Sequence, residues 1–161
     1  MIFLTVGTQL PFDRLVGAVD LWMGDHPEVE GLAQIGRSTL RPRNMQHRGV
    51  MPPAELDDVL ASATLVVAHA GMGTILTSLQ RSIPILVMPR LARFGEQRND
   101  HQLATSRALG RRPNIYVAED ETRVPQMLDR LLPPPPFEGP PLGPDASPGL
   151  LDAVRRSIAE A

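Results

Sequence analysis

Residues 65–100 read LVVAHAGMGTILTSLQRSIPILVMPRLARFGEQRND and contain the clearest structural pattern in the chain. The apolar run Leu65–Ala68 is typical of a strand buried on both faces of a parallel sheet. A turn with two glycines follows it, and a second run of the same kind, Ile85–Met88, lies between Pro84 and Pro89. The segment between the turn and Pro84 has the apolar spacing of a helix. The pattern therefore predicts a strand, a glycine turn, a helix and a second strand.

The glycine turn predicts an anion site at the N-terminus of that helix. Gly71 and Gly73 lack the Cβ atoms that would keep a ligand away from the backbone. The first main-chain N–H groups of a helix have no partner inside it, and the helix dipole is positive there, so this end favours a phosphate. We expect six consecutive residues to form the phosphate site, with the threonine hydroxyl as an additional donor. They are His69, Ala70, Gly71, Met72, Gly73 and Thr74.

Other interpretations of the turn stay open at the level of sequence. Glycines at a strand-to-helix turn also occur in α/β proteins that bind nothing there. His69 either positions the turn or donates a hydrogen bond to a phosphate. The dinucleotide-binding fingerprint of nicotinamide enzymes fits poorly, because Leu76 stands where its third glycine belongs and because the turn follows a late strand.

The rest of the chain continues the alternation of strands and helices. Ile2–Val6 predicts a first strand, the turn Gly7–Thr8 follows it, and the apolar spacing then predicts a helix from about Pro11 to Gly24, with Trp22 in the core. Further strands are expected at 32–36, 46–50 and 114–118, and further helices near 53–63, 103–109 and 124–131. This order indicates an α/β fold with a Rossmann-like, doubly wound parallel sheet, whose ligands lie beyond the carboxyl ends of the strands.

Length and composition restrict the class of protein. A chain of 161 residues is one domain by size, and its net charge of −2 gives no basic field that favours nucleic acid as a partner. The absence of cysteine excludes disulfides and thiolate catalysis and fits a reducing compartment. The start resembles no signal peptide, and no apolar stretch reaches the ~20 residues that cross a bilayer. We therefore expect a soluble, cytoplasmic protein.

The C-terminal part of the chain changes character. Residues 1–132 form the predicted domain, residues 133–149 are a proline-rich, stiff connector, and residues 150–161 have the apolar spacing of one more helix. The acidic run Glu119–Glu121 could suggest a metal site. It directly precedes a predicted helix, however, and the dipole of that helix explains it better, so we expect no metal.

Additional motifs accompany the glycine turn. HAGMGT at His69–Thr74 is followed by Pro84, by Pro89 and by NDHQ at Asn99–Gln102, and the chain opens with FLTVGTQLPFD at Phe3–Asp13. As a set they resemble the C-terminal, donor-binding domain of glycosyltransferase family 28, and the opening is similar to the small single-domain members such as Alg13 and the bacterial exopolysaccharide subunit PssE. The resemblance covers about residues 1–132. It implies the C-terminal, donor half of a GT-B glycosyltransferase.

The resemblance also implies a substrate. The donor would be a UDP-sugar, with no cofactor, and Gly7 and Thr8 would join the glycine turn in binding it. In the family, polar side chains hold the donor sugar. For the corresponding positions of this chain, the alternative is that they form the ordinary polar surface of a helix. These positions are Glu96, Asn99, His101 and Gln102. The acidic residue that grips the ribose in the family corresponds to Thr77, which makes a weaker hydrogen bond, so the identity of the nucleotide is left open.

The resemblance finally implies a partner chain. A GT-B enzyme needs two such domains, and the sequence shows no histidine and carboxylate that it can place together as a general base. We expect a membrane-anchored subunit similar to Alg14 or PssD, which would bring a polyprenyl-diphosphate-linked acceptor for hexosyl transfer in exopolysaccharide biosynthesis. Arg90, Arg93 and Arg98 are expected to face this partner or the acceptor phosphates, and the alternative is that they belong to an ordinary solvated loop. The alternatives are a catalytically silent subunit that stabilises a partner enzyme and a sugar-nucleotide epimerase domain, although epimerases usually carry two domains in one chain.

Overall fold

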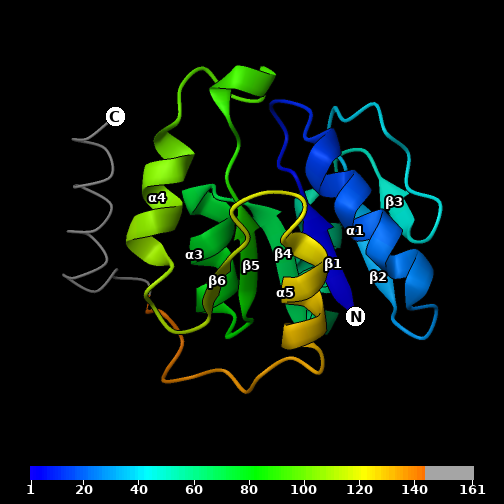
Figure 1. The fold of residues 1–161 in the computed structure, drawn as a ribbon. Helices are drawn as coiled ribbons and strands as arrows, with labels where there is room; N and C mark the ends of the chain where they lie inside the picture. The colour runs from blue at the N-terminus through cyan, green and yellow to red at the C-terminus, as the bar shows by residue number, and fades with distance from the viewer. Residues whose placement is uncertain (144–161) are drawn as a thin grey trace.

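The structure is a computed structural model, and it describes residues 1–143. Within them, six parallel strands form a single sheet in the order β3-β2-β1-β4-β5-β6 (Figure 1). The strands are β1 (Ile2–Thr5), β2 (Gly31–Gln34), β3 (Gln46–Arg48), β4 (Leu65–His69), β5 (Ile85–Met88) and β6 (Ile115–Val117). The direction of the order reverses between β1 and β4, which creates the topological switch point of a doubly wound sheet. The predicted Rossmann-like α/β fold is confirmed.

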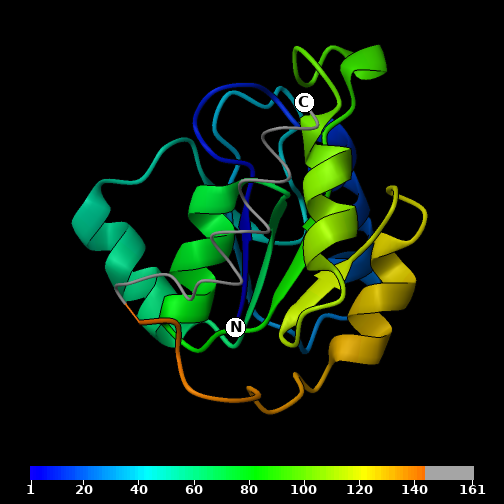
Figure 2. The ribbon, with the colours of Figure 1, turned by 90° about the vertical axis from the view of Figure 1, so that its left-hand side faces the viewer.

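Helices cover both faces of this sheet, which Figure 2 shows nearly edge-on. The helices are α1 (Asp13–Asp25), α2 (Pro53–Ser62), α3 (Met72–Gln80), α4 (His101–Leu109) and α5 (Val124–Leu131), and a short 3-10 helix, η1 (Ala92–Phe94), follows β5. Residues of α1 and α5 pack on one face, and residues of α2, α3 and α4 pack on the other. Because both faces are covered, the central strands β1, β4 and β5 are apolar except for Thr5 and His69 at the carboxyl ends of β1 and β4.

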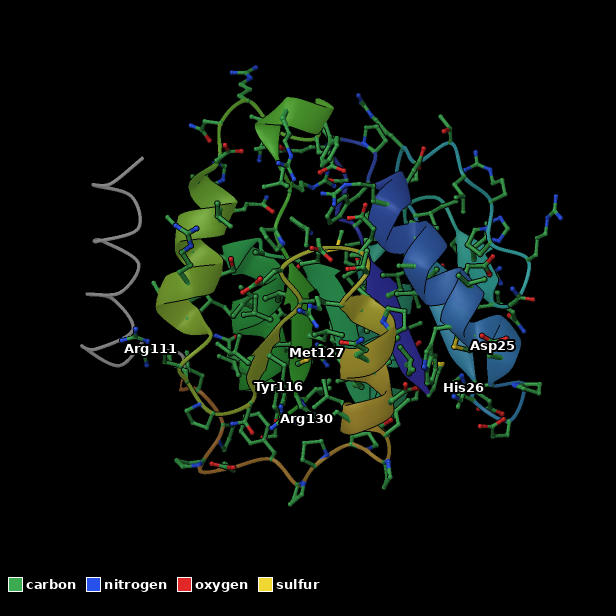
Figure 3. The ribbon with its side chains drawn as sticks, viewed as in Figure 1. Asp25, His26, Arg111, Tyr116, Met127 and Arg130 are labelled. Atoms are coloured by element: carbon green, nitrogen blue, oxygen red, sulfur yellow. The ribbon has the colours of Figure 1, made fainter. Side chains whose placement is uncertain are left out.

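Trp22 lies in the core, as its spacing predicts, and it also ties two helices together. The indole is 4% exposed, and its Nε1 donates a hydrogen bond of 2.7 Å to Oδ1 of Asp129 on α5. His26, labelled in Figure 3 near the end of α1, stacks on the indole with 3.9 Å between the ring centroids. The pairing of α1 with α5 on one face of the sheet therefore combines apolar burial with a directed hydrogen bond.

The element boundaries differ slightly from the predicted ones. α1 begins at Asp13 instead of Pro11, and β2 comprises Gly31–Gln34 instead of residues 32–36. β2 ends before Gly36, whose φ of 53° turns the chain out of the extended conformation. A Cβ at Gly36 would lie 2.5 Å from the carbonyl oxygen of Gly7, so only glycine allows this close approach of two loops.

Part of the proline-rich segment is attached to the domain. Phe137 and Leu142 pack against the apolar cluster on the side of α2, α3 and α4. The side-chain amide of Asn114 donates to the carbonyl oxygen of Glu138 over 2.9 Å and accepts from the N–H of Glu138 over 2.8 Å. The predicted connector thus follows the surface of the domain as far as it is described, and the helix predicted at 150–161 lies outside the described residues.

Candidate functional site

A cavity of about 300 Å³ opens at the carboxyl ends of β1, β4 and β5. The loops after these strands and the N-terminal ends of α3 and α4 surround it. Most residues of the predicted donor site line this cavity: Gly7, Thr8, His69, Gly71, Gly73, Thr74, Glu96, His101 and Gln102. The fold therefore brings three distant parts of the sequence together at the switch point of the sheet, where doubly wound proteins bind ligands.

The remaining predicted residues lie outside the cavity lining. Ala70 is buried and Met72 packs beside it against the core on the side of α2, α3 and α4. Thr77 lies one turn further along α3 than Gly73, and the exposed Asn99 pairs with the ring of His101. Ala70 and Met72 therefore support the turn from behind, whereas Thr77 and Asn99 border the site.

The imidazole of His69 lies between two glycines. A Cβ at Gly71 would lie 2.3 Å from Nε2 of the ring, and a Cβ at Gly7 would lie 2.9 Å from Cε1. Gly71 and Gly7 are therefore required to accommodate the imidazole, whereas we had expected Gly71 to leave room for a ligand. Gly73 is different, because a Cβ there would meet no atom within 4 Å. Gly73 is the glycine of the turn that leaves space open at the cavity.

His69 is neutral in this environment. Its Nδ1 atom is buried and has no hydrogen-bond partner within residues 1–143. Burial, together with the positive charge of Arg90, lowers the pKa of His69 to about 4. The imidazole therefore adds no charge to the cavity at neutral pH, and its role there is to position the turn or to make a neutral hydrogen bond.

The lowered pKa of His69 makes the fold sensitive to acid. An unfolded chain binds a proton on histidine near pH 6.5, whereas folded His69 stays neutral down to about pH 4. The unfolded state binds more protons in this interval, so stability falls as the pH drops from 6.5 toward 4. We expect His69 to account for a loss of roughly 2 kcal/mol between pH 7 and pH 5. Urea denaturation of the wild type and of His69→Gln at both pH values measures it, and equal losses in the two proteins would contradict the assignment.

The N-terminus of α3 faces the cavity without a cap. Gly71 is the N-cap residue, no side chain hydrogen-bonds to the first turn, and the first turn contains no acidic residue. Gly73 and Thr74 of this turn line the cavity. The main-chain N–H groups at the start of a helix point out along its axis and carry a partial positive charge. An anionic ligand is the natural partner for such an end.

Arg90 joins the two loops that frame the cavity. Its side chain is buried, and Nη2 donates to the carbonyl oxygens of Val6 and Leu10, both over 2.7 Å. Nη1 donates to the carbonyl oxygens of Pro11 over 2.7 Å and Glu96 over 3.1 Å. Burial lowers the pKa of Arg90, and the charge of Glu96 opposes this effect. The prediction that Arg90 faces a partner is wrong, because its donors are occupied inside the domain.

Removal of the Arg90 side chain should destabilise the whole domain. Arg90→Ala leaves four main-chain carbonyl groups without their donors in or near a buried site, so we expect a loss of about 3 kcal/mol of unfolding free energy. Arg93→Ala is the matched control, because Arg93 is exposed and its guanidinium stacks on Phe94 at 4.8 Å from the ring centroid. The control should change stability by less than about 0.5 kcal/mol. Urea denaturation measures both variants, and similar effects of the two would refute the role of Arg90.

Glu96 lines the cavity, but its carboxylate is already paired. Its two oxygens accept from Nε and Nη2 of Arg14 on α1, both over 2.7 Å, and Oε2 also accepts from the N–H of Leu91 over 3.0 Å. Burial by itself would lower the pKa of Arg14, but hydrogen bonds to Glu96 and Glu121 raise it. Glu96 thus fixes the loop after β5 against α1. This role differs from the predicted one, in which the carboxylate holds the donor sugar.

The acidic run Glu119–Glu121 has no single role. Asp120 accepts from the main-chain N–H of Arg123, the N-cap residue of α5, over 3.3 Å, which agrees with the predicted function at a helix start. Glu121 instead pairs with Arg14 and so belongs to the network beside the cavity. Within residues 1–143, no three histidine, cysteine, aspartate or glutamate side chains gather closely enough to hold a metal ion.

Several residues at the cavity were not expected from the sequence. Arg14 pairs with Glu96, which is 82 residues away, and Arg90 contacts carbonyl groups up to 84 residues away, so no local pattern marks these contacts. The lining also includes Val6, Gln9, Leu10 and Gln97, which were not predicted to belong to the site. For Val6, Gln9 and Leu10 a signal existed, because they belong to the opening motif FLTVGTQLPFD.

The sequence matches the model of the glycosyltransferase family 28 C-terminal domain over residues 1–140. The chain belongs to this family. No curated protein matches it. The family assignment agrees with the resemblance in the motifs, and the family 28 domain includes the part of the proline-rich segment that packs on the sheet.

Solved structures share the fold of this family 28 domain. The solution structure of ALG13 has a TM-score of 0.58 and 20% identity, and the match covers 86% of this chain and 89% of ALG13. The crystal structure of the glycotransferase of kitacinnamycin has a TM-score of 0.58 and 21% identity, and the glycosyltransferase VinC in complex with DTDP has a TM-score of 0.51 and 20% identity. Both matches cover 99% of this chain, which spans only 39% and 36% of those two proteins. The fold is thus that of the C-terminal half of a GT-B glycosyltransferase, as predicted.

Proposed function

We propose that this family 28 domain is the donor-binding subunit of a two-chain glycosyltransferase. It binds a UDP-sugar, and the assembled enzyme transfers the hexosyl group to a polyprenyl-diphosphate-linked acceptor in exopolysaccharide biosynthesis. The acceptor comes with a membrane-anchored subunit similar to Alg14 or PssD. This partner recruits the chain to the inner face of the membrane.

The N-terminus of α3 is the main structural support for this function. The uncapped N-terminus of α3 opens into the cavity at the switch point of the sheet, and Gly73 leaves that end free of side-chain atoms. A diphosphate fits this position because main-chain N–H groups and the helix dipole both favour negative charge. The hydroxyl of Thr74 supplies a further donor. Family membership and the fold shared with VinC, which was solved in complex with DTDP, support a nucleoside diphosphate as the ligand.

The same geometry has a consequence for the transfer step. When the bond between the sugar and the diphosphate breaks, negative charge grows on the leaving diphosphate oxygen. Donors that are already oriented toward that position stabilise the charge without reorganisation. The α3 terminus supplies such donors, while Gln102 is held in place because its Oε1 accepts from the N–H of Arg90 over 3.1 Å. His101 and Gln102, at the start of α4, are left to contact the sugar.

The residue expected to bind the ribose forms weaker hydrogen bonds in this chain than the acidic residue of the family pattern. Thr77 follows Gly73 by four positions on α3, so both lie on the same side of the helix. A threonine hydroxyl at this place offers one hydrogen bond to a ribose, where a carboxylate offers two charge-assisted ones. UDP-sugars and dTDP-sugars are therefore both to be tested as donors.

Gly73→Val tests the placement of the diphosphate. The branched side chain would occupy the open space at the helix N-terminus, so we expect UDP affinity to fall at least 30-fold, which corresponds to about 2 kcal/mol. Gly49→Val is the matched control, because a Cβ at Gly49 also meets no atom within 4 Å and Gly49 does not line the cavity. Isothermal titration with UDP measures both proteins, after urea denaturation has shown that each is folded. Unchanged affinity in folded Gly73→Val would refute the phosphate site.

Two features support a second chain. The match covers 89% of ALG13 but only 39% and 36% of the kitacinnamycin and VinC enzymes. Within residues 1–143, the cavity offers no free carboxylate as a general base, because Glu96 is paired with Arg14, and the lowered pKa of His69 makes it a weak base. No helix within residues 1–143 is long and apolar enough to span a bilayer.

An activity assay separates the two-chain enzyme from its alternatives. We expect no transfer from radiolabelled UDP-sugars to a polyprenyl-diphosphate acceptor by this chain alone, and transfer by the complex with the protein encoded beside it. Gly73→Val in the complex should abolish transfer, and Gly49→Val should not. Transfer by the isolated chain would overturn the requirement for a partner.

The second candidate function is a catalytically silent subunit that stabilises a partner enzyme. The observation in its favour is the commitment of the Glu96 carboxylate to Arg14 and Leu91, which leaves the cavity without a free acidic group. A silent subunit need not bind nucleotide. Failure of UDP and dTDP to bind the folded chain, or failure of the complex to transfer any sugar tested, would favour this candidate.

A further inference from the structure

Within residues 1–143, the outer edge of β6 has no neighbouring strand. β6 pairs with β5 on one side, and it is the last strand in the order of the sheet. The N–H of Ile85 donates to the carbonyl of Asn114, and the N–H of Ala118 donates to the carbonyl of Val87, both over 2.9 Å. Because alternate residues of a strand face the same neighbour, the main-chain groups of Ile115 and Val117 point to the outer side, where the N–H of Ile115 donates to the carbonyl of Arg112 over 3.4 Å.

A groove runs along this edge. It has a volume of about 680 Å³, and its lining includes every residue of β6, the turn that precedes β6 and residues of α5. Figure 3 shows Arg111 below α4, Tyr116 on β6, and Met127 and Arg130 on α5, on the side of the molecule where β6 ends the sheet. The groove lies away from the donor cavity, which opens at the carboxyl ends of β1, β4 and β5.

The charge at the groove is positive. Arg111 and Arg130 line it, and within residues 1–143 neither forms a hydrogen bond or an ion pair. Arg112 adds a third guanidinium to the lining, and Glu138 is the acidic residue there. The main-chain N–H and carbonyl of Glu138 pair with the side chain of Asn114, which directly precedes β6 and also lines the groove.

We propose that the open edge of β6 receives an extended, acidic segment of a partner polypeptide, which adds to the sheet as a seventh strand. The carbonyl of Ile115 and the N–H and carbonyl of Val117 pair with the backbone of the added segment, and its carboxylates pair with Arg111 and Arg130. A three-residue edge makes few main-chain hydrogen bonds, and short edges usually protect a sheet from unwanted pairing. The arginines therefore supply the selectivity, because only an acidic strand gains both kinds of contact.

A labelled peptide tests the two kinds of contact separately. The probe is a fluorescein-labelled nonapeptide in which glutamate alternates with valine, and its control carries lysine in place of glutamate. We expect fluorescence anisotropy to show micromolar binding of the acidic peptide and none of the lysine peptide. Arg111→Glu and Arg130→Glu should each weaken binding at least tenfold. Arg43→Glu is the matched control, since Arg43 is an exposed arginine in the loop between β2 and β3, and it should leave binding unchanged.

The strand addition itself is tested through the main chain. Val117→Pro removes the outward N–H, and proline is tolerated on an edge strand at such a position, so binding should fall at least fivefold in a folded protein. If this variant does not fold, N-methylation of alternate peptide bonds in the probe gives the same test on the wild type. Absence of binding, or binding that survives both arginine variants, would overturn the proposal. Binding that needs the arginines but tolerates N-methylation would also overturn it, in favour of an anion site without strand pairing.

Discussion

The buried guanidinium of Arg90 is the interaction on which the candidate site depends. It donates to carbonyl oxygens of the loop after β1 and of the loop after β5, so two segments without regular structure have one shared anchor. A buried cation is costly unless its donors are satisfied, and buried carbonyl groups are costly without a donor. The guanidinium therefore requires the carbonyl groups, and the carbonyl groups require the guanidinium. This mutual pairing holds the loops in one geometry around the cavity.

The glycines at this site have two different roles. Gly7 and Gly71 leave space for the imidazole of His69, which burial and Arg90 keep neutral. Gly73 leaves space at the helix terminus, where the cavity is open. A single motif thus places a neutral ring beside the site and an unobstructed positive helix end within it. This combination suits a ligand that brings its own negative charge.

The acidic side chains near the cavity serve the scaffold. Glu96 and Glu121 both pair with Arg14, which links the loop after β5 to α1 and to the segment before α5. Both carboxylates share the one guanidinium of Arg14, and the Glu96 side chain is buried. Within residues 1–143, the one carboxylate that lines the cavity, that of Glu96, is therefore committed to holding the scaffold together.

The sequence by itself determined the features that depend on short-range patterns. The apolar runs predicted the parallel strands, the helical spacing predicted the helices that cover them, and the motif His69–Thr74 predicted the glycine turn that lines the cavity, because each pattern is complete within a few residues. The tertiary structure alone decided the partners of Arg90, the pairing of Glu96 with Arg14 and the open edge of β6. The contacts of Arg90 and Glu96 join residues that are tens of positions apart, and the edge of β6 depends on which strand ends the sheet. Long-range contacts and strand order follow only from how the whole chain packs.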